Sequence, residues 1–472
     1  MSTIKITELP VSCALTGTEV VPVVQGSDTV KTTTQNIANL AGGIIAVGAG
    51  TCSTVRVGNN NTASGCYSTV SGGANNTASG YYGFSTVGGG SYNSANNSCS
   101  TVGGGTNNTA CGIVSTIGGG AFNTASGNTS TIGGGMSNLS CNSSSTVGGG
   151  TNNKAQGSSS TVSGGGCNTA SKGCSTIGGG NSNTASAYFS TVGGGRLNTS
   201  SGVASTVAGG RNNTASGGCN ATVGGGQFNV SSCDQTTIGG GLCNTASGNN
   251  STVSGGNLNT ASGYCSTVGG GRQNTASYEK STVGGGGYNT ASGKSSTVGG
   301  GNRNTASGCY STISGGGGRG YFGQYGNTSN GNWSTIGGGL NNVTSCNAST
   351  IGGGKGNTVS NTYSTIGGGN LNTASGGYST IGGGRQNIAS GGCSVIVGGL
   401  GNTASGIYSA ILGGKSNNTN SCNFAMIIGT GITADMCNTT FVNCLSIKNI
   451  PTSSLGLCSG MVYSELGTLK IV

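Results

Sequence analysis

The stretch STVGGGTNNTACGIV, residues 100–114, runs directly into STIGGGAFNTASGNT, residues 115–129. The two share a fifteen-residue phrase, S-T-[V/I]-G-G-G-x-x-N-T-A-S-G-x-x, which repeats from about residue 51 to about residue 426. Self-similarity at a short fixed period predicts a stack of repeats rather than a conventional globular domain.

The third residue of the phrase is β-branched throughout, and we number other positions of the phrase from it. The 24 Val or Ile residues are Val55, Val70, Val87, Val102, Ile117, Ile132, Val147, Val162, Ile177, Val192, Val207, Val223, Ile238, Val253, Val268, Val283, Val298, Ile313, Ile336, Ile351, Ile366, Ile381, Ile396 and Ile411.

Alternation along the phrase predicts two short strands and two turns in each repeat. In S-T-V-G-G the Val or Ile points to one side and its neighbours to the other, and in N-T-A-S-G the Ala points inward. Glycines mark the turns. We therefore predict an all-β parallel β-solenoid, or β-roll, of about 24 fifteen-residue coils. Small β modules are expected at its ends, with domains 1–50, 51–425 and 426–472.

Asn stands six residues after the β-branched residue in every repeat but one, where Arg319 occupies the place. Asn tolerates the left-handed backbone conformation, so it could form the corner of the coil. Stacked Asn amides could instead hydrogen-bond along the solenoid as a ladder. The sequence leaves both interpretations open, and neither requires a ligand.

The composition argues against an enzyme. The chain has 472 residues with 103 Gly, no His and seven acidic residues, although its net charge is +10. Acid–base and metal chemistry draw mainly on the missing residue types, so we expect no catalytic, cofactor or metal site. We expect no nucleic-acid partner, because no known recognition module is visible. The beginning, MSTIKITELP, has no apolar signal region, and no apolar run suits a membrane span.

Energetics favour association of several chains. Ordering fifteen residues costs about 15–30 kcal/mol, whereas one buried Val or Ile contributes about 1.5–3 kcal/mol. Ladder hydrogen bonds add about 0.5–1.5 kcal/mol each, so a coil is marginal by itself. We therefore predict a homo-oligomer packed along its length, with a trimer favoured. A thin monomer held by disulfides is the alternative.

Variable positions of the phrase are the candidate contact surfaces. The position three before the Val or Ile, written −3, is often aromatic and includes Trp333, while the +4 position gathers cations. A longer repeat between Ile313 and Ile336 adds eight residues. Each feature has an explanation without a ligand. The aromatic residues could pack between coils, the cations could maintain solubility, and the long repeat could be a tolerated loop. The candidate contacts are Arg319, Tyr321, Phe322, Tyr325, Trp333, Arg196, Arg211, Arg272 and Arg385.

Nineteen cysteines are many for a chain without a visible signal region. Cys52 and Cys66 fall near the same corner of adjacent coils, as do Cys219 and Cys233, and coil spacing is compatible with disulfide reach. These four are candidate disulfide partners. Small apolar thiols that fill space are the alternative.

The units A-S-G-x-x-S-T-V-G-G-G resemble the β-roll head repeats of trimeric autotransporter adhesins of the YadA type. The ends resemble other proteins: I-x-E-L-P, L-T-G-T-E and V-P-V-V-Q-G within residues 6–40 resemble the N-terminal module of phage and large-virus structural proteins. N-x-P-T-S, G-L-x-S-G and G-T-L-K-I-V within residues 445–472 resemble the closing hairpin of viral fibre and tail proteins.

These resemblances imply a virion fibre with an attachment module, a repetitive shaft and a cap. Its expected partners are the virion or appendage base, through residues 1–50, and a glycan or protein of the host surface. Its expected location is the virion surface, outside the cell after assembly. The alternatives are a bacterial surface adhesin, and an ice-binding solenoid that uses its flat columns of Thr.

Overall fold

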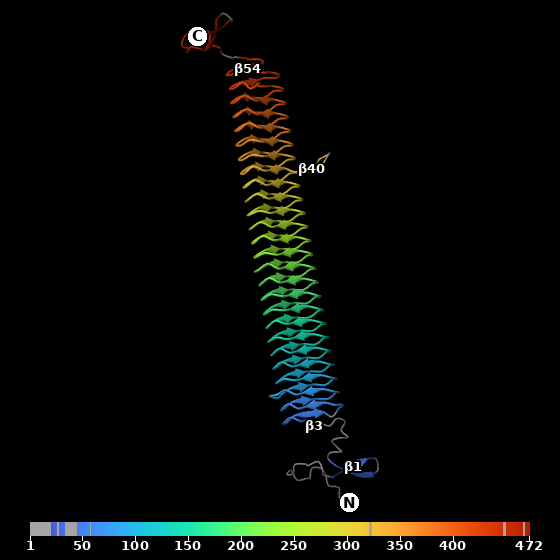
Figure 1. Ribbon diagram of the computed structural model, residues 1–472. Helices are drawn as coiled ribbons and strands as arrows, with labels where there is room; N and C mark the ends of the chain where they lie inside the picture. The colour runs from blue at the N-terminus through green and yellow to red at the C-terminus, as the bar shows by residue number, and fades with distance from the viewer. Residues whose placement is uncertain are drawn as a thin grey trace. The chain divides into compact units, whose positions relative to one another are not determined.

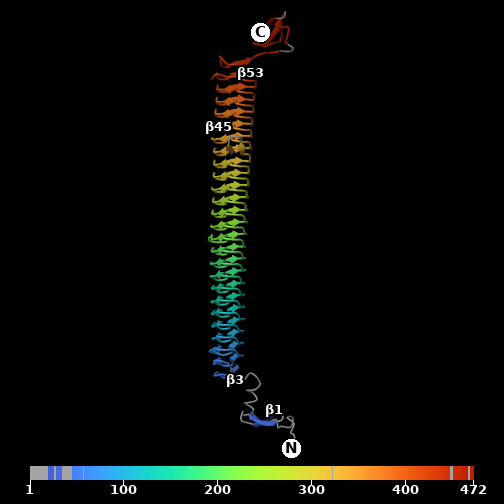
Figure 2. The same cartoon turned by 90° about the vertical axis from the view of Figure 1, so that its right-hand side faces the viewer.

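The computed structural model describes residues 20–25, 28–33, 45–56, 58–320, 323–446, 450–465 and 468–472. Contacts divide the chain into two units, residues 1–243 and residues 244–472, here called unit 1 and unit 2. Each unit contains a stack of coils (Figures 1 and 2). Every described element is a strand. The structure is thus an all-β parallel solenoid of about 25 coils, as the repeat predicts.

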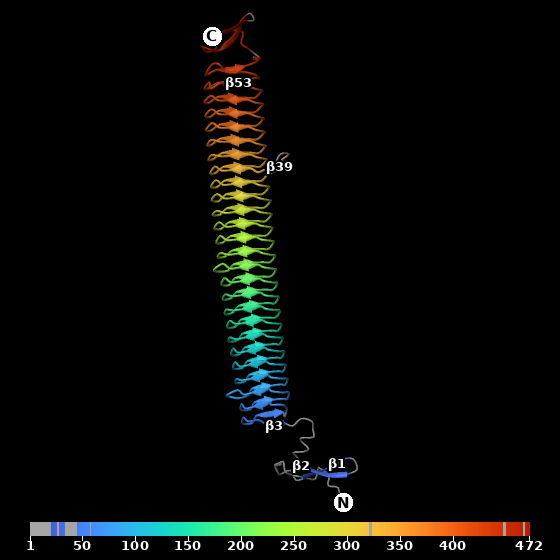
Figure 3. The same cartoon turned by 45° about the vertical axis from the view of Figure 1, so that its right-hand side comes forward.

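Each coil contributes one strand to each of two sheets. The valine sheet contains the −1 residue and the Val or Ile, and the alanine sheet contains the +7 and +8 residues. Strands pair in parallel with their copies one repeat away, for example Val102 with Ile117 and Ala110 with Ala125. Arrows of successive coils therefore lie above one another and point the same way (Figure 3).

The strands of the two sheets in unit 1 are short. Its valine sheet contains β4 (Thr54–Arg56), β6 (Thr69–Val70), β8 (Thr86–Val87), β10 (Thr101–Val102), β12 (Thr116–Ile117), β14 (Thr131–Ile132), β16 (Thr146–Val147), β18 (Thr161–Val162), β20 (Thr176–Ile177), β22 (Thr191–Val192), β24 (Thr206–Val207), β26 (Thr222–Val223) and β28 (Thr237–Ile238). Its alanine sheet contains β5 (Thr62–Ala63), β7 (Thr77–Ala78), β9 (Ser94–Ala95), β11 (Thr109–Ala110), β13 (Thr124–Ala125), β15 (Leu139–Ser140), β17 (Lys154–Ala155), β19 (Thr169–Ala170), β21 (Thr184–Ala185), β23 (Thr199–Ser200), β25 (Thr214–Ala215) and β27 (Val230–Ser231).

Unit 2 repeats the arrangement. Its valine sheet contains β30 (Thr252–Val253), β32 (Thr267–Val268), β34 (Thr282–Val283), β36 (Thr297–Val298), β38 (Thr312–Ile313), β42 (Thr335–Ile336), β44 (Thr350–Ile351), β46 (Thr365–Ile366), β48 (Thr380–Ile381), β50 (Val395–Ile396), β52 (Ala410–Ile411), β53 (Met426–Ile428) and β54 (Thr440–Val442). Its alanine sheet contains β29 (Thr245–Ala246), β31 (Thr260–Ala261), β33 (Thr275–Ala276), β35 (Thr290–Ala291), β37 (Thr305–Ala306), β41 (Thr328–Ser329), β43 (Val343–Thr344), β45 (Thr358–Val359), β47 (Thr373–Ala374), β49 (Ile388–Ala389) and β51 (Thr403–Ala404). Parallel pairing thus continues past residue 425, through β53 and β54.

Antiparallel hairpins accompany the stacks. β1 (Val20–Gln25) pairs with β2 (Asp28–Thr33), and β3 (Ile45–Val47) pairs with β4. In unit 2, β39 (Gly318–Gly320) pairs with β40 (Gly323–Tyr325), and β55 (Val462–Glu465) pairs with β56 (Thr468–Ile471). The hairpin expected near the C-terminus is therefore present, and the long repeat carries a hairpin as well.

The seam between the two sheets is dry. Every Val or Ile of the column is buried from Val70 to Ile411, and only Val55, in the first coil, is half-buried. The Ala residues predicted to point inward are buried opposite them. The predicted inward columns are therefore confirmed.

Polar columns complete the seam. Ser at the −2 position lies on the same side of the strand as the Val or Ile and is buried in most coils, and Ser115 shows one way in which its hydroxyl is bonded. The Oγ of Ser115 donates to the carbonyl oxygen of Gly112 at 2.7 Å. A small hydroxyl such as that of Ser115 can be buried because it bonds back to its own turn. Six other buried hydroxyls of this column have no hydrogen-bond partner among the described residues, namely those of Ser130, Ser251, Ser266, Ser311, Ser379 and Ser394.

The Asn column forms a ladder. Asn153 is fully buried, and its Nδ2 donates to the carbonyl oxygens of Gly149 in the same coil and Gly165 in the next, both at 2.8 Å. Its Oδ1 accepts from the backbone N–H of Asn168 at 3.1 Å. Positive φ angles occur at the preceding residue, Asn152, and not at Asn153. The ladder interpretation is confirmed, and the corner interpretation is wrong.

The break in this ladder that was expected at Arg319 does not occur. The backbone N–H of Asn327 donates to Oδ1 of Asn304, and Oδ1 of Asn327 accepts from the N–H of Asn342. Arg319 belongs to the inserted hairpin, and Asn327 takes the vacant place after it. An insertion is tolerated because the chain returns to the same position before the next strand.

The third glycine of the G-G-G run is required sterically. Gly150 has a φ of 87°, and a Cβ on it would lie 2.1 Å from the carbonyl oxygen of Gly165. It would also lie 2.7 Å from Nδ2 of Asn153. Only glycine allows this turn to approach both the next coil and the ladder.

Left-handed backbone at the −3 position predicts a stabilising substitution. Val114 has a φ of 57°, which a β-branched residue rarely adopts. Val114→Asn should raise the unfolding free energy by about 1 kcal/mol, because it relieves that strain. Its neighbour Ile113 has similar exposure and no positive φ, so Ile113→Asn is the matched control. Chemical denaturation measures both. Equal changes in the two variants would contradict the argument.

Candidate interaction surfaces

The two turns of each coil form two edges of the solenoid. The −3 edge contains positions −5 to −3, where the chain passes from the alanine sheet to the valine sheet. The +4 edge contains positions +4 and +5, where the chain returns. Because one turn precedes each valine strand and the other follows it, the two edges lie at opposite ends of the coil.

Aromatic rings stack along the −3 edge. Tyr363 and Tyr378, in adjacent coils, have ring centroids 4.9 Å apart and an interplanar angle of 8°. Both rings are more than half exposed. Packing between coils therefore accounts for part of this column, while the outer ring faces remain accessible. The stacked pairs are Tyr67 and Phe84, Tyr310 and Trp333, Tyr363 and Tyr378, and Tyr408 and Phe424.

Cations line the +4 edge. In unit 1, Arg196 and Arg211 pair as adjacent residues of this column. In unit 2, Lys355, Arg385 and Lys415 occupy alternate coils and are exposed. No Asp or Glu occupies a +4 or +5 position of the described coils. This edge is positively charged, which suits an anionic surface.

Two cations of this edge also contact an aromatic ring. The guanidinium carbons of Arg272 and Arg303 lie 5.7 and 4.8 Å from the ring centroid of Tyr288. The Tyr288 ring attracts both guanidinium groups through cation–π contact. Arg303 and Tyr288 are therefore further members of the +4 edge, which the spacing of the cations alone did not indicate.

The structure separates the residues of the long repeat. Arg319 belongs to β39 and Tyr325 to β40, which leave the coil at the +4 edge, and Figure 1 shows this hairpin outside the stack. Trp333 lies on the −3 edge, where it stacks on Tyr310 with centroids 6.0 Å apart. Tyr321 and Phe322 lie outside the described residues. Trp333 is thus near the hairpin in sequence but at the other end of the coil.

The candidate disulfide partners are free thiols in the structure. Cys52 and Cys219 are exposed, whereas Cys66 and Cys233 are half-buried. All four belong to the −3 edge, as expected from the repeat. Their pairing stays a prediction for oxidising conditions.

Another thiol has a distinct environment that the repeat did not indicate. The pKa of the Cys422 thiol is raised, mainly by burial and further by contact with Cys437. Cys422 is 8% exposed, and its Sγ lies 3.8 Å from the carbonyl oxygen of Ala434. Within the described residues, no group of three or more His, Cys, Asp or Glu side chains could hold a metal ion.

Slow alkylation should reveal that environment. We expect iodoacetamide at neutral pH to modify Cys422 several-fold more slowly than the exposed Cys99, because the thiolate is the reacting form. Peptide mass mapping over time measures both rates. Equal rates in the folded protein would contradict the burial, and equal rates after denaturation are the control.

An apolar patch occupies the outer face of the valine sheet in the last coils of unit 2. Elsewhere this face carries Thr at −1 and mainly Gly at +1. Here Val397 and Leu412 are 54% and 45% exposed, and Ile428 and Val442 follow them in the next strands. Contiguous exposed apolar residues often mark a protein contact. The members of this end patch are Val395, Val397, Ala410, Leu412, Met426, Ile428 and Val442.

Among the described residues, no helix is long and apolar enough to cross a bilayer. Comparison with models of known protein families gives no match, and comparison with curated proteins gives no relative.

Proposed function

We propose that the protein is a structural fibre protein of a virion, without enzymatic activity, and that its coils form a stiff shaft displayed outside the particle. The observation that carries this proposal is that each coil buries its inward side chains and hydrogen-bonds to the next coil. The apolar, Asn and Ser columns are buried within the stack, so the repeat serves rigidity and leaves its edges for contacts. At about 4.8 Å per coil, the thirteen valine strands of unit 1 span roughly 60 Å.

The sequence of the ends supports the virion assignment. The I-x-E-L-P and V-P-V-V-Q-G elements precede the coils, and G-T-L-K-I-V follows them in the hairpin of β55 and β56. We propose that residues 1–50 attach the fibre to the particle or an appendage base. The exposed edges would then meet host-surface glycans or proteins.

Immunogold electron microscopy tests the location. Antibodies raised against residues 100–129 should label fibres on the outside of purified particles of the source virus. Labelling of a bacterial cell surface instead would favour the adhesin alternative. Labelling of neither would contradict both proposals.

We further propose that the fibre is a homotrimer and that the end patch of unit 2 lies in the contact between copies. The seam of each coil is already buried in one chain, so the apolar surface left for association is chiefly this patch and the edge aromatics. The change from Thr and Gly to aliphatic residues over consecutive strands favours a protein partner over solvent.

Charge insertion into the patch tests this association. Leu412→Glu should weaken the oligomer by at least about 30-fold, because a carboxylate would be buried without a partner. Ser314→Glu, on the same exposed face but outside the patch, is the matched control. Cross-linking and sedimentation measure the oligomeric state. A monomeric wild-type protein would contradict the trimer, and equal effects of the two variants would contradict the role of the patch.

Ice binding is a second candidate, favoured by one observation. The −1 position of the valine sheet is Thr in every coil of unit 1 from Thr54 to Thr237. The outer face of this sheet therefore carries a continuous row of Thr hydroxyl and methyl groups. Thermal hysteresis of the purified protein measures this activity, and its absence would eliminate the candidate.

A further inference from the structure

A hollow interrupts the −3 edge of unit 2. It has a volume of about 400 Å³ and is open to solvent. Its lining residues are Gly263, Tyr264, Ser277, Tyr278 and Glu279. Tyr264 and Tyr278 are 52% and 54% exposed, so much of both side chains faces solvent.

The register of the coils brings these residues together. Tyr264, Glu279 and Lys294 occupy the −4 position of three consecutive coils, each about 4.8 Å from the next. Tyr278 precedes Glu279 in the same turn. The floor is backbone, because a Cβ on Gly263 would lie 1.9 Å from the carbonyl oxygen of Tyr278.

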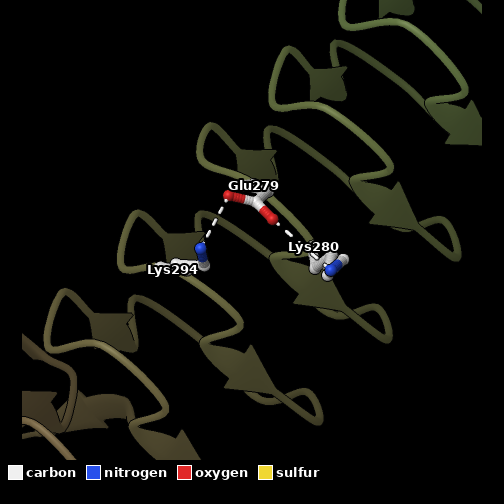
Figure 4. A network of polar contacts seen from close by, with 3 residues as sticks. All are labelled: Glu279, Lys280 and Lys294. Carbon is white, nitrogen blue, oxygen red and sulfur yellow. Dashed lines mark ion pairs between the residues drawn. The ribbon is translucent and has the colours of Figure 1, made fainter.

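Glu279 is fixed by two lysines. Its Oε2 lies 3.0 Å from Nζ of Lys294, and its Oε1 lies 3.4 Å from Nζ of Lys280 (Figure 4). The hydrogen bond from Lys294, together with the contact to Lys280, holds the pKa of Glu279 below its usual range. The carboxylate is therefore ionised near neutral pH and accepts hydrogen bonds. No other Asp or Glu occurs between residues 244 and 434.

We propose that this hollow binds a neutral pyranose unit of a glycan. The face of a pyranose ring presents C–H groups, which pack on aromatic rings such as Tyr264 and Tyr278. Its hydroxyls donate to carboxylate oxygens and accept from ammonium groups. Glu279 in the lining supplies the carboxylate, and Lys280 and Lys294, which pair with Glu279 beside the hollow, supply the ammonium groups. Three coils span roughly 10 Å, which accommodates one sugar ring and its linkage.

The charges argue for an uncharged ring. A ligand cation would meet Lys280 and Lys294, whose ammonium groups already neutralise the carboxylate. A ligand carboxylate would meet Glu279 in the lining of the hollow and would compete with it for the same two ammonium groups. Like-charge contacts at a binding site are unfavourable, so both charged classes are disfavoured relative to a neutral sugar. The proposal goes beyond the structural role of the fibre and does not depend on a virion location.

Saturation-transfer NMR on the full chain tests the site. The probes are methyl β-D-galactopyranoside, methyl α-D-mannopyranoside and methyl N-acetyl-β-D-glucosaminide, at millimolar concentration, with N-acetylneuraminic acid and glucosamine as charged counterparts. At least one neutral probe should receive saturation from the protein. The charged sugars should receive less saturation than this probe. If no neutral probe receives saturation, or if a charged sugar binds more strongly than the neutral probes, the proposal is overturned.

Variants locate the binding. Tyr278→Ala and Glu279→Gln should each weaken binding by about tenfold or more. Tyr363→Ala, an exposed aromatic of the same edge outside the hollow, is the matched control. The backbone of Tyr278 bonds to Ser281 through both its N–H and its carbonyl, so Tyr278→Ala retains these bonds. An unchanged unfolding temperature verifies folding. Equal loss in Tyr363→Ala, or no loss in Tyr278→Ala and Glu279→Gln, would also overturn the proposal.

Discussion

Asn153→Asp is expected to lower the unfolding free energy of the surrounding coils by at least about 3 kcal/mol. The substitution keeps the shape of the side chain but removes both hydrogen bonds that Nδ2 donates to Gly149 and Gly165. The carbonyl oxygen of Gly149 then loses its donor, which costs about 1–3 kcal/mol, whereas that of Gly165 keeps the backbone N–H of Thr151. The new carboxylate would also face two carbonyl oxygens, which disfavours its ionised form.

This prediction has a defined pH dependence. Burial against carbonyl oxygens should raise the pKa of the introduced Asp in the folded state above its unfolded value. The folded state then binds the proton more tightly, so stability is lost as pH rises through the folded pKa and recovers as pH falls. Protonation also restores one donor. The defect should therefore be largest near neutral pH.

Hydrogen exchange over residues 138–168 measures the effect, because each coil contacts only its neighbours and the loss is local. The matched control is Asn152→Asp, at an exposed position with left-handed backbone that Asp tolerates. Equal loss of protection in the two variants would contradict the ladder as a source of stability.

Val268→Asp should also destabilise unit 2, by about 4 kcal/mol or more. Val268 is fully buried and pairs with Val253 and Val283 in the adjacent coils. An Asp there would be buried without a partner, which is among the most costly single substitutions. The apolar seam would be interrupted in the middle of the stack.

Thr267→Asp is the matched control, because Thr267 belongs to the same strand and is only half-buried. Denaturant unfolding followed by circular dichroism measures both variants. If Val268→Asp behaved like Thr267→Asp, the β-branched column would face water and the solenoid described here would be wrong.

Much of the fold could be predicted from local rules. One Val or Ile and one Ala in each period of fifteen residues indicate two strands with one inward residue each, and both columns are buried as predicted. The Asn column was also visible, but its role was not. Asn at a turn suits either a left-handed corner or a ladder, and only the φ angles and the bonds of residues such as Asn153 distinguish them.

The candidate sites depended more on tertiary structure. Trp333 and the inserted hairpin are neighbours in sequence, but the alanine strand β41 between them places them at opposite edges. Leu412 and Val397 are ordinary aliphatic residues in the sequence, and their exposure follows from their outward place in the valine sheet. The hollow at Tyr264 and Glu279 arises from the stacking of separate coils.

The sequence by itself determined the period, the strand positions and the inward apolar columns, because these depend on alternation within a few residues of chain. The tertiary structure decided which polar side chains are buried, how Asn327 restores the ladder, and which edge residues meet. The physical reason is that hydrogen bonds and contacts between coils depend on the register of residues fifteen or more apart, which no local pattern specifies.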